Sequence, residues 1–145
     1  MPRWVREVFD DYASRLTGGL KLSLIEIAPG ARGAGHSAEQ AMAVEGSRIE
    51  ASLRKGDYVA ALDEHGDLFR TRELSSWLAA RMQGGRDIAF LIGGPDGLSS
   101  NVLARCDFKW SLSPLTFPHA LVRVVLAEQL YRAQSVLNNH PYHRD

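Results

Sequence analysis

The chain has 145 residues, and its 17 basic and 17 acidic side chains give no formal net charge. This length fits one domain, which we expect to span residues 1–145 and to bury about two-thirds of the surface that the unfolded chain exposes. The neutral balance argues against indiscriminate binding to nucleic acid, because phosphate neutralisation drives such binding. A small RNA site with a local basic patch stays possible.

Membrane, secretion and metal signals are weak. No apolar run approaches the roughly 20 residues that span a bilayer, and the N-terminal stretch has no apolar signal core. Cys106 is the only cysteine, which excludes an intrachain disulfide and a Cys-based metal site. The five histidines do not show metal-ligand spacing. We therefore expect a soluble, cytoplasmic protein that holds no metal.

The hydrophobic pattern alternates between strand-like and helix-like segments. In the first part of the chain we predict a helix over 2–16, a strand over 20–27, a flexible Gly-rich loop over 28–36 and a helix from the Ser37/Gln40 capping box to Gly56. In the middle we predict a strand over 57–63, a polar loop over 64–72, a helix over 74–82 and a strand from 87 that ends in glycines at 93–94. The last part is predicted to contain a helical turn at 102–103, a strand over 108–112 and a helix from Pro118. This order predicts an α/β fold with an open, mainly parallel sheet and helices on both faces.

The final helix has two apolar stripes. Leu121, Val125, Leu130 and Leu137 form the first, and Val124, Ala127 and Tyr131 form the second. A helix that is apolar on two sides must be covered on two sides. We expect the sheet to provide one cover and a partner subunit to provide the other.

Two loops follow predicted strands, at the sheet edge where open α/β folds bind ligands. GGPDG (93–97) fits a tight turn that needs positive φ, or a ligand loop, but lacks the Lys-Ser/Thr of a phosphate-binding P-loop. SLSPLTFPH (111–119) fits a two-proline connector, or a loop whose backbone holds an adenine between apolar walls. Facing one another, the two loops would form a cofactor pocket.

The C-terminal tail concentrates groups that transfer protons or bind anions. Its last six residues include His140, Tyr142, His143 and Arg144. Disordered tails are usually rich in Lys, Glu, Ser and Gly instead. This composition favours a role in a site. Arg132, four residues after Glu128, is typical of a surface ion pair on a helix.

Several long motifs resemble the ribosomal RNA large subunit methyltransferase H family, the pseudouridine-N3 methyltransferases of the SPOUT (α/β-knot) superfamily. The likeness covers essentially the whole chain. It is carried by MPRWVREVFDDY (1–12), DYVAALDEHG (57–66), LIGGPDGLS (91–99), WSLSPLTFPHALVRVVLAEQLYRA (110–133) and NHPYHRD (139–145).

The resemblance implies a homodimer with a deep C-terminal trefoil knot that binds S-adenosylmethionine. It implies methylation of a pseudouridine in large-subunit (23S) rRNA on the assembled ribosome. Family members usually begin with a further strand, which we expect to be missing here. Carried over to this sequence, the cofactor-binding residues are Leu62, Gly93, Leu112, Ser113, Pro114, Leu115, Thr116 and Phe117.

Methyl transfer to N3 needs no metal, but it needs removal of the N3 proton and stabilisation of the anionic base. We expect His143 to be the base, with Arg144 or Arg132 stabilising negative charge. Tyr142 would stack on or hydrogen-bond the substrate base, and His119 would orient its loop. Two alternatives stay open: a non-catalytic ribosome-binding factor, and another SPOUT RNA methyltransferase, such as one that modifies a ribose 2′-oxygen of tRNA.

Overall fold

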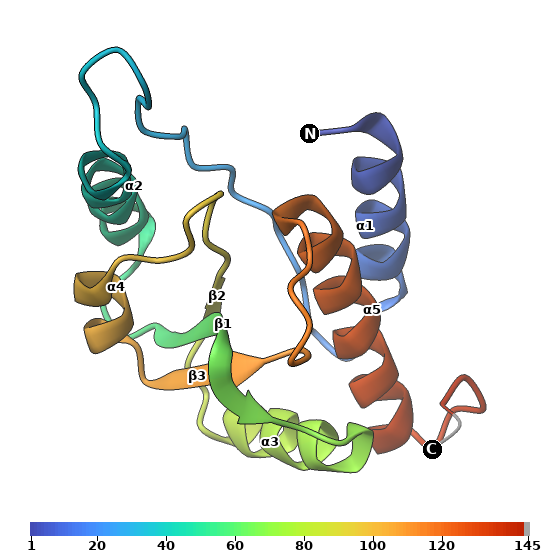
Figure 1. The fold of residues 1–145 in the computed structure, drawn as a ribbon. Coiled ribbons are helices and arrows are strands. Elements are labelled where there is room, and N and C mark those ends of the chain that lie inside the picture. Colours follow the sequence, from blue (N-terminus) through green and yellow to red (C-terminus); the bar gives the residue numbers. More distant parts are fainter. Residues whose placement is uncertain (144–145) are drawn as a thin grey trace. The chain divides into compact units, whose positions relative to one another are not determined.

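The computed structural model describes residues 1–143, which form two compact units (Figure 1). The helical unit comprises Met1–Leu24, Phe69–Gly85 and the described part of Phe117–Asp145. The sheet unit comprises Ile25–Leu68 and Arg86–Thr116. Because the chain alternates between the units, each is built from segments far apart in sequence. The expected single domain stays a prediction.

The sheet unit contains a three-stranded parallel sheet in the order β2-β1-β3. β1 (Tyr58–Leu68) lies between β2 (Ile88–Leu91) and β3 (Phe108–Ser111). The predicted parallel α/β arrangement is therefore confirmed. The short apolar strands suit this place, since parallel strands are usually covered by helices.

Two helices of the sheet unit, α2 (Ala38–Ser52) and α4 (Ser100–Arg105), pack against the sheet. The two helices, β1 and β2 each contribute one residue to a shared core cluster, which consists of Ile49, Val59, Leu91 and Val102. The predicted capping box starts α2: the Gln40 amide donates to Ser37 Oγ at 3.1 Å, and the Ser37 amide donates to Gln40 Oε1 at 2.9 Å. The cap fixes where α2 begins.

Two predictions about the chain between these elements are wrong. The segment 20–27 forms no strand. Its leucines at 20, 22 and 24 are half-buried and alternate with exposed residues, so the period-2 pattern reflects one-sided burial without a pairing partner. The polar loop expected from Glu64 begins only after Leu68, because β1 pairs with β3 again at Asp67 and Leu68.

A bulge joins the two paired stretches of β1. Leu62 and Asp67 both pair with Trp110, so the residues between them are extra. A Cβ on Gly66 would lie 2.6 Å from the Lys109 backbone, so only glycine permits this close approach.

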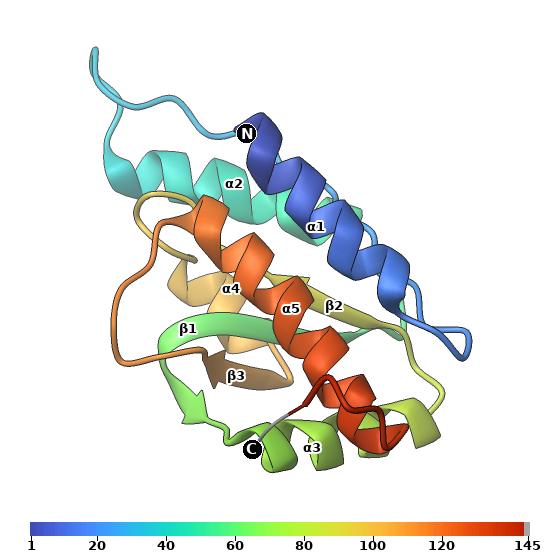
Figure 2. The same cartoon turned by 90° about the vertical axis from the view of Figure 1, so that its right-hand side faces the viewer.

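The helical unit contains α1 (Arg3–Arg15), α3 (Thr71–Gln83) and α5 (His119–Leu137). α1 runs alongside α5, and α3 packs against α5 as well (Figure 2). Hydrogen bonds support these contacts: the Gln134 side chain bonds the Thr17 backbone at a part-buried position, and the buried Ser75 Oγ donates to the Ala133 carbonyl at 3.1 Å. All three helices were predicted, including Pro118 as the start of α5.

Two helices of the helical unit cover part of α5. Within the helical unit, α1 and α3 are the two elements that pack on it. Its buried residues are Leu126, Ala127, Leu130, Ala133, Gln134 and Ser135. Of the two predicted apolar stripes, Leu130 and Ala127 are buried, and Leu137 is exposed. The homodimer stays a prediction.

Candidate active site

Seven of the eight predicted cofactor-binding residues belong to the sheet unit, at the carboxyl edge of the sheet. The last β1 residue paired with β2 is Ala61, opposite Leu91, and Leu62 follows it. Gly93 comes two residues after Leu91, and the segment 112–116 directly follows β3. Because the strands are parallel, their carboxyl ends meet at one edge, where open α/β sheets bind ligands. The sheet therefore gathers Leu62 and both loops at this edge.

The loop after β2 is a tight, closely packed turn. The Gly97 amide donates to the Gly94 carbonyl at 3.0 Å, and Gly97 has φ 79°. The predicted turn with positive φ is thus confirmed. A Cβ on Gly93 would lie 2.5 Å from the Gly97 carbonyl carbon, so Gly93 lets the loop fold back on its own backbone.

The loop after β3 is held by short side-chain hydrogen bonds. Ser111 Oγ donates to the Ser113 carbonyl at 2.9 Å, and Ser113 Oγ accepts from the Leu115 amide at 3.0 Å. Thr116 Oγ1 donates to Glu64 Oε2 at 3.1 Å, which ties the loop to the bulge of β1. Leu115 is 70% exposed, so this loop presents an apolar side chain outward.

The remaining predicted residues of the loop after β3 differ in exposure, and one of them belongs to the helical unit. Leu112 is half-buried and Pro114 is exposed. Phe117 is half-buried and begins the third segment of the helical unit. It is the one predicted cofactor residue outside the sheet unit.

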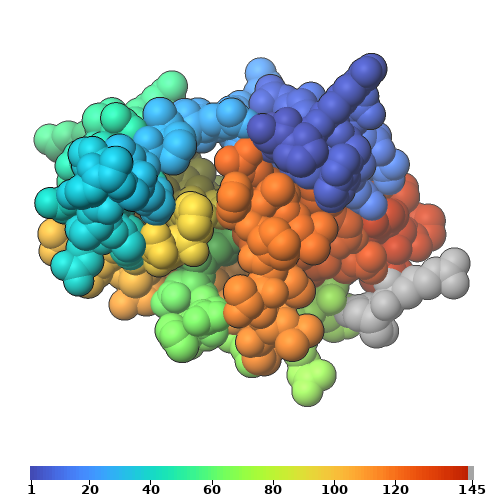
Figure 3. All heavy atoms as spheres, turned by 45° about the horizontal axis from the view of Figure 1, so that its top comes forward, coloured from blue at the N-terminus to red at the C-terminus, as the bar shows by residue number. Residues whose placement is uncertain are grey.

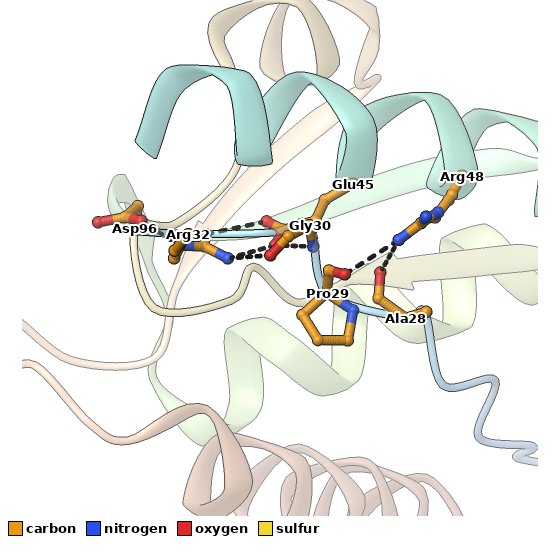
Figure 4. Close-up of polar contacts among 7 residues, drawn as sticks. All are labelled: Ala28, Pro29, Gly30, Arg32, Glu45, Arg48 and Asp96. Atoms are coloured by element: carbon orange, nitrogen blue, oxygen red, sulfur yellow. Dashed lines mark hydrogen bonds and ion pairs between the residues drawn. The ribbon is translucent and has the colours of Figure 1, made fainter. Parts of the chain in front are cut away.

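A charged network, which we call the Arg32 triad (Arg32, Glu45 and Asp96), lies beside the loop after β2 (Figure 4). Arg32 Nη1 lies 2.7 Å from Glu45 Oε2, and Arg32 Nε lies 2.9 Å from Asp96 Oδ2. The Gly30 amide also donates to Glu45 Oε2 at 2.9 Å. In the space-filling view, the surface near residue 95 (yellow) lies against that of residues 30–45 (cyan) (Figure 3). The predicted Gly-rich loop is thus tied down at Gly30 and Arg32.

The triad was missed by sequence reasoning, although one signal pointed to it. Glu45 is only 8% exposed and shares the buried face of α2 with Ala41 and Ile49 at i, i+4 spacing. An acid on the apolar stripe of a helix needs a partner, because buried charges are almost always paired. Hydrogen bonds from Arg32 lower the pKa of Glu45 despite its burial, with a further contribution from the Gly30 amide.

The C-terminal tail packs within the helical unit through Tyr142. Its hydroxyl donates to Glu128 Oε2 at 2.8 Å and lies 3.4 Å from the Tyr12 hydroxyl. The Tyr142 ring centroid is 4.5 Å from that of Tyr131, and the Arg132 guanidinium lies 5.0 Å from the Tyr142 ring. Burial raises the pKa of Tyr142, and the hydrogen bonds to Tyr12 and Glu128 act in the same direction. The phenol therefore stays protonated at neutral pH.

The other predicted catalytic residues occupy different positions in the helical unit. His143 follows Tyr142, and its Nδ1 atom is buried without a hydrogen-bond partner among the described residues. Arg132 forms the predicted ion pair with Glu128 at 2.9 Å. His119 is the exposed first residue of α5. Arg144 lies outside the described residues. The tail thus brings Tyr142, Arg132 and Glu128 together.

Two general properties of the described residues bear on the type of site. In residues 1–143, no helix is long and apolar enough to span a membrane. Within the same range, no cluster of His, Cys, Asp or Glu could hold a metal ion.

Comparison with known proteins identifies the family. The model of a predicted SPOUT methyltransferase matches residues 1–143. The chain is 50% identical to the ribosomal RNA large subunit methyltransferase H of Burkholderia ambifaria, over 99% of this chain and 92% of that protein. The proteins of that name from Paraburkholderia xenovorans and Alkalilimnicola ehrlichii are 51% and 53% identical, with the same coverage. The chain therefore belongs to the SPOUT methyltransferase family, and it is a methyltransferase.

Proposed function

We propose that this protein transfers a methyl group from S-adenosylmethionine to N3 of a pseudouridine in large-subunit (23S) rRNA, on the assembled ribosome. The observation that carries the proposal is 50% identity, over 99% of the chain, to a ribosomal RNA large subunit methyltransferase H. A neutral chain suits a target read as a composite surface, because binding to naked RNA would rely on phosphate neutralisation.

The proposed donor site is the carboxyl edge of the sheet. Leu62, Gly93 and the loop 112–117 would hold the methyl donor, mainly through backbone groups and apolar side chains. This fits what the two loops offer, since one is a tight glycine turn and the other presents Leu115 outward. S-adenosylmethionine supplies an electrophilic methyl group on its sulfonium. The loops would fix that methyl group in line with N3.

We propose that residues of the tail remove the N3 proton and that an arginine stabilises the substrate base. His143 would accept the N3 proton as N3 forms its bond to the methyl carbon and the carbon–sulfur bond breaks. The residue type supports this role, because imidazole is the side chain that most often serves as a general base. Arg144 or Arg132 would stabilise the negative charge on the base oxygens.

The geometry changes the role that we propose for Tyr142. Its hydroxyl and ring are already engaged by Glu128, Tyr131 and Arg132. Such a side chain suits holding the tail in place better than stacking on the substrate base. We therefore propose Tyr142 as the residue that positions His143, while His119 orients the loop before α5.

The assembly and cellular location follow from the same proposal. We propose a cytoplasmic homodimer with the knotted chain path of the superfamily, in which the tail completes its own or the partner's pocket. Light scattering tests the dimer directly. A well-folded monomer at micromolar concentration would contradict it.

Methylation of purified ribosomes with labelled S-adenosylmethionine tests the activity, and mapping of the labelled nucleotide tests the target. We expect label on a single pseudouridine of the large-subunit rRNA. Binding to ribosomes without binding of S-adenosylmethionine would instead indicate a non-catalytic ribosome-binding factor. Transfer to a ribose of tRNA would indicate a different SPOUT activity.

A further inference from the structure

The Arg32 triad connects three separate parts of the sheet unit. Arg32 comes from the Gly-rich loop, Glu45 from the middle of α2 and Asp96 from the turn after β2. Arg32 bonds both carboxylates at once, because its guanidinium offers donors in a planar fork. Figure 4 shows the side chain of Arg32 between the two acids. The triad is therefore a bridge between loops that are 64 residues apart in sequence.

The energetics make the bridge hard to rearrange. Glu45 is 8% exposed, so its carboxylate has little water to replace a lost partner. Because its pKa is lowered, Glu45 stays charged at neutral pH and is stabilised by a neighbouring cation. The two Nη atoms of Arg32 bond Glu45, and its Nε then holds Asp96 at 2.9 Å. A buried charge thus fixes the place of a more exposed one.

The part that the triad holds is the turn proposed to contact the methyl donor. Asp96 is a member of the 93–97 turn, and a Cβ on Gly94 would lie 3.5 Å from Glu45 Oε1. The internal bond from the Gly97 amide to the Gly94 carbonyl sets the shape of the turn. Two contacts tie the turn to its surroundings: Leu98, directly after it, packs against the core cluster that includes Ile49 of α2, and Asp96 pairs with Arg32 of the triad. Misplacement of a binding loop by about 1 Å is enough to cost a large factor in rate.

We propose that the Arg32 triad is a positioning device for donor binding: it contacts no ligand and holds the 93–97 turn where S-adenosylmethionine needs it. This inference rests on the proposed function. It assigns roles to Arg32, Glu45 and Asp96, which lie outside the predicted cofactor residues.

Asp96→Asn is the sharpest test, because Asp96 is partly exposed and its loss leaves the Arg32–Glu45 pair intact. We expect the Kd for S-adenosylmethionine to rise about tenfold in calorimetry, with the thermal midpoint nearly unchanged. Asp96→Glu, which keeps the charge, should recover part of the affinity. Hydrogen exchange without S-adenosylmethionine should become faster at the Gly97 amide in Asp96→Asn.

Arg48→Gln is the matched control. Arg48 also lies on α2 and holds the same Gly-rich loop, through the Ala28 and Pro29 carbonyls at 2.8 and 3.0 Å. It makes no contact with the 93–97 turn in these hydrogen bonds. We expect the Kd of Arg48→Gln for S-adenosylmethionine to stay within about twofold of the parent value, since the Arg32–Asp96 pair still holds the turn.

The outcomes separate this proposal from the one on which it rests. A parent protein that does not bind S-adenosylmethionine overturns both. A parent that binds, with Asp96→Asn binding equally well, overturns the positioning role alone. Equal losses of affinity in Asp96→Asn and Arg48→Gln also overturn it, because they would show a general effect of loosening the Gly-rich loop.

Discussion

Close backbone packing sets the shape of the loop after β2, whereas side chains fix the C-terminal tail. At the sheet edge, Gly93 lies so close to Gly97 that a single added carbon would clash. In the tail, Tyr142 is fixed by a hydroxyl–carboxylate bond to Glu128 and by neighbouring rings. The contrast matches two tasks that a methyltransferase must perform. A backbone cradle suits binding a donor in one fixed pose, and titratable side chains suit moving a proton from a substrate.

The largest expected effect is on the rate of methyl transfer, from a substitution in the C-terminal tail. His143→Ala should lower the rate of methyl transfer to ribosomes by at least about a hundredfold, because a lost general base typically costs that much. His140→Ala is the control for tail packing, since it removes an exposed imidazole whose Nδ1 accepts a hydrogen bond from the Tyr142 amide at 3.1 Å while leaving His143 in place. Its rate should fall by only a few-fold. Equal rates for His143→Ala and the parent would refute the proposed base.

The next largest expected effect is on the affinity for S-adenosylmethionine, from a substitution at the carboxyl edge of the sheet. Gly93→Ala should raise the Kd for S-adenosylmethionine by more than about tenfold, because the new Cβ forces the turn to open. Gly94→Ala is the control within the same turn, as its Cβ would meet Glu45 at an ordinary 3.5 Å. Calorimetry on both variants, with circular dichroism to confirm folding, decides the matter. Parental affinity in folded Gly93→Ala would remove this turn from the site.

Acid should weaken the sheet unit through Glu45. Its lowered pKa means that the folded form prefers the carboxylate, so this stability is present above the ordinary value of 4.5 and is lost as pH falls below it. Glu45→Gln should cost about 2 kcal/mol at neutral pH, typical of a hydrogen bond to a charged group. Its difference from the parent in urea unfolding should shrink below pH 4.5. A pH-independent difference would contradict this assignment.

Alkali should weaken the helical unit through Tyr142, with a smaller effect. A raised pKa means that the folded form prefers the neutral phenol, so this stability is present below the ordinary value of 10.0 and is lost as pH rises through the folded pKa. Tyr142→Phe should cost about 1 kcal/mol below pH 10.0. The gap between the two thermal midpoints should narrow above that pH. A gap that widens there would mean that Tyr142 is ionised in the folded protein.

Local patterns made most of the fold predictable from sequence. Helix spacing, glycine stops and the Ser37 capping box gave the helices, and short apolar runs gave the three strands. The strand expected over 20–27 failed because alternation reports burial on one side and carries no information about pairing. The second pairing of β1 was not predictable, since it depends on a bulge and on the close approach at Gly66.

The candidate site was predictable only where its residues are contiguous or follow a strand. Gly93 and the 112–117 loop directly follow strands, and the tail is a short run of unusual composition. The Arg32 triad joins residues from three distant segments, so the local pattern could mark Glu45 as an acid on an apolar helix stripe but could not name its partners. The partners of Tyr142 likewise come from α1 and α5.

The dependence of the methyl-transfer rate on S-adenosylmethionine concentration, measured on ribosomes for Gly93→Ala and His143→Ala, tests the division of labour most directly. If the sheet edge binds the donor and the tail moves the proton, Gly93→Ala raises KM and recovers rate at high donor concentration. His143→Ala then keeps the parental KM, and its kcat stays low at every concentration. A raised KM with parental kcat in His143→Ala would contradict this division, because it would make the tail a donor-binding element.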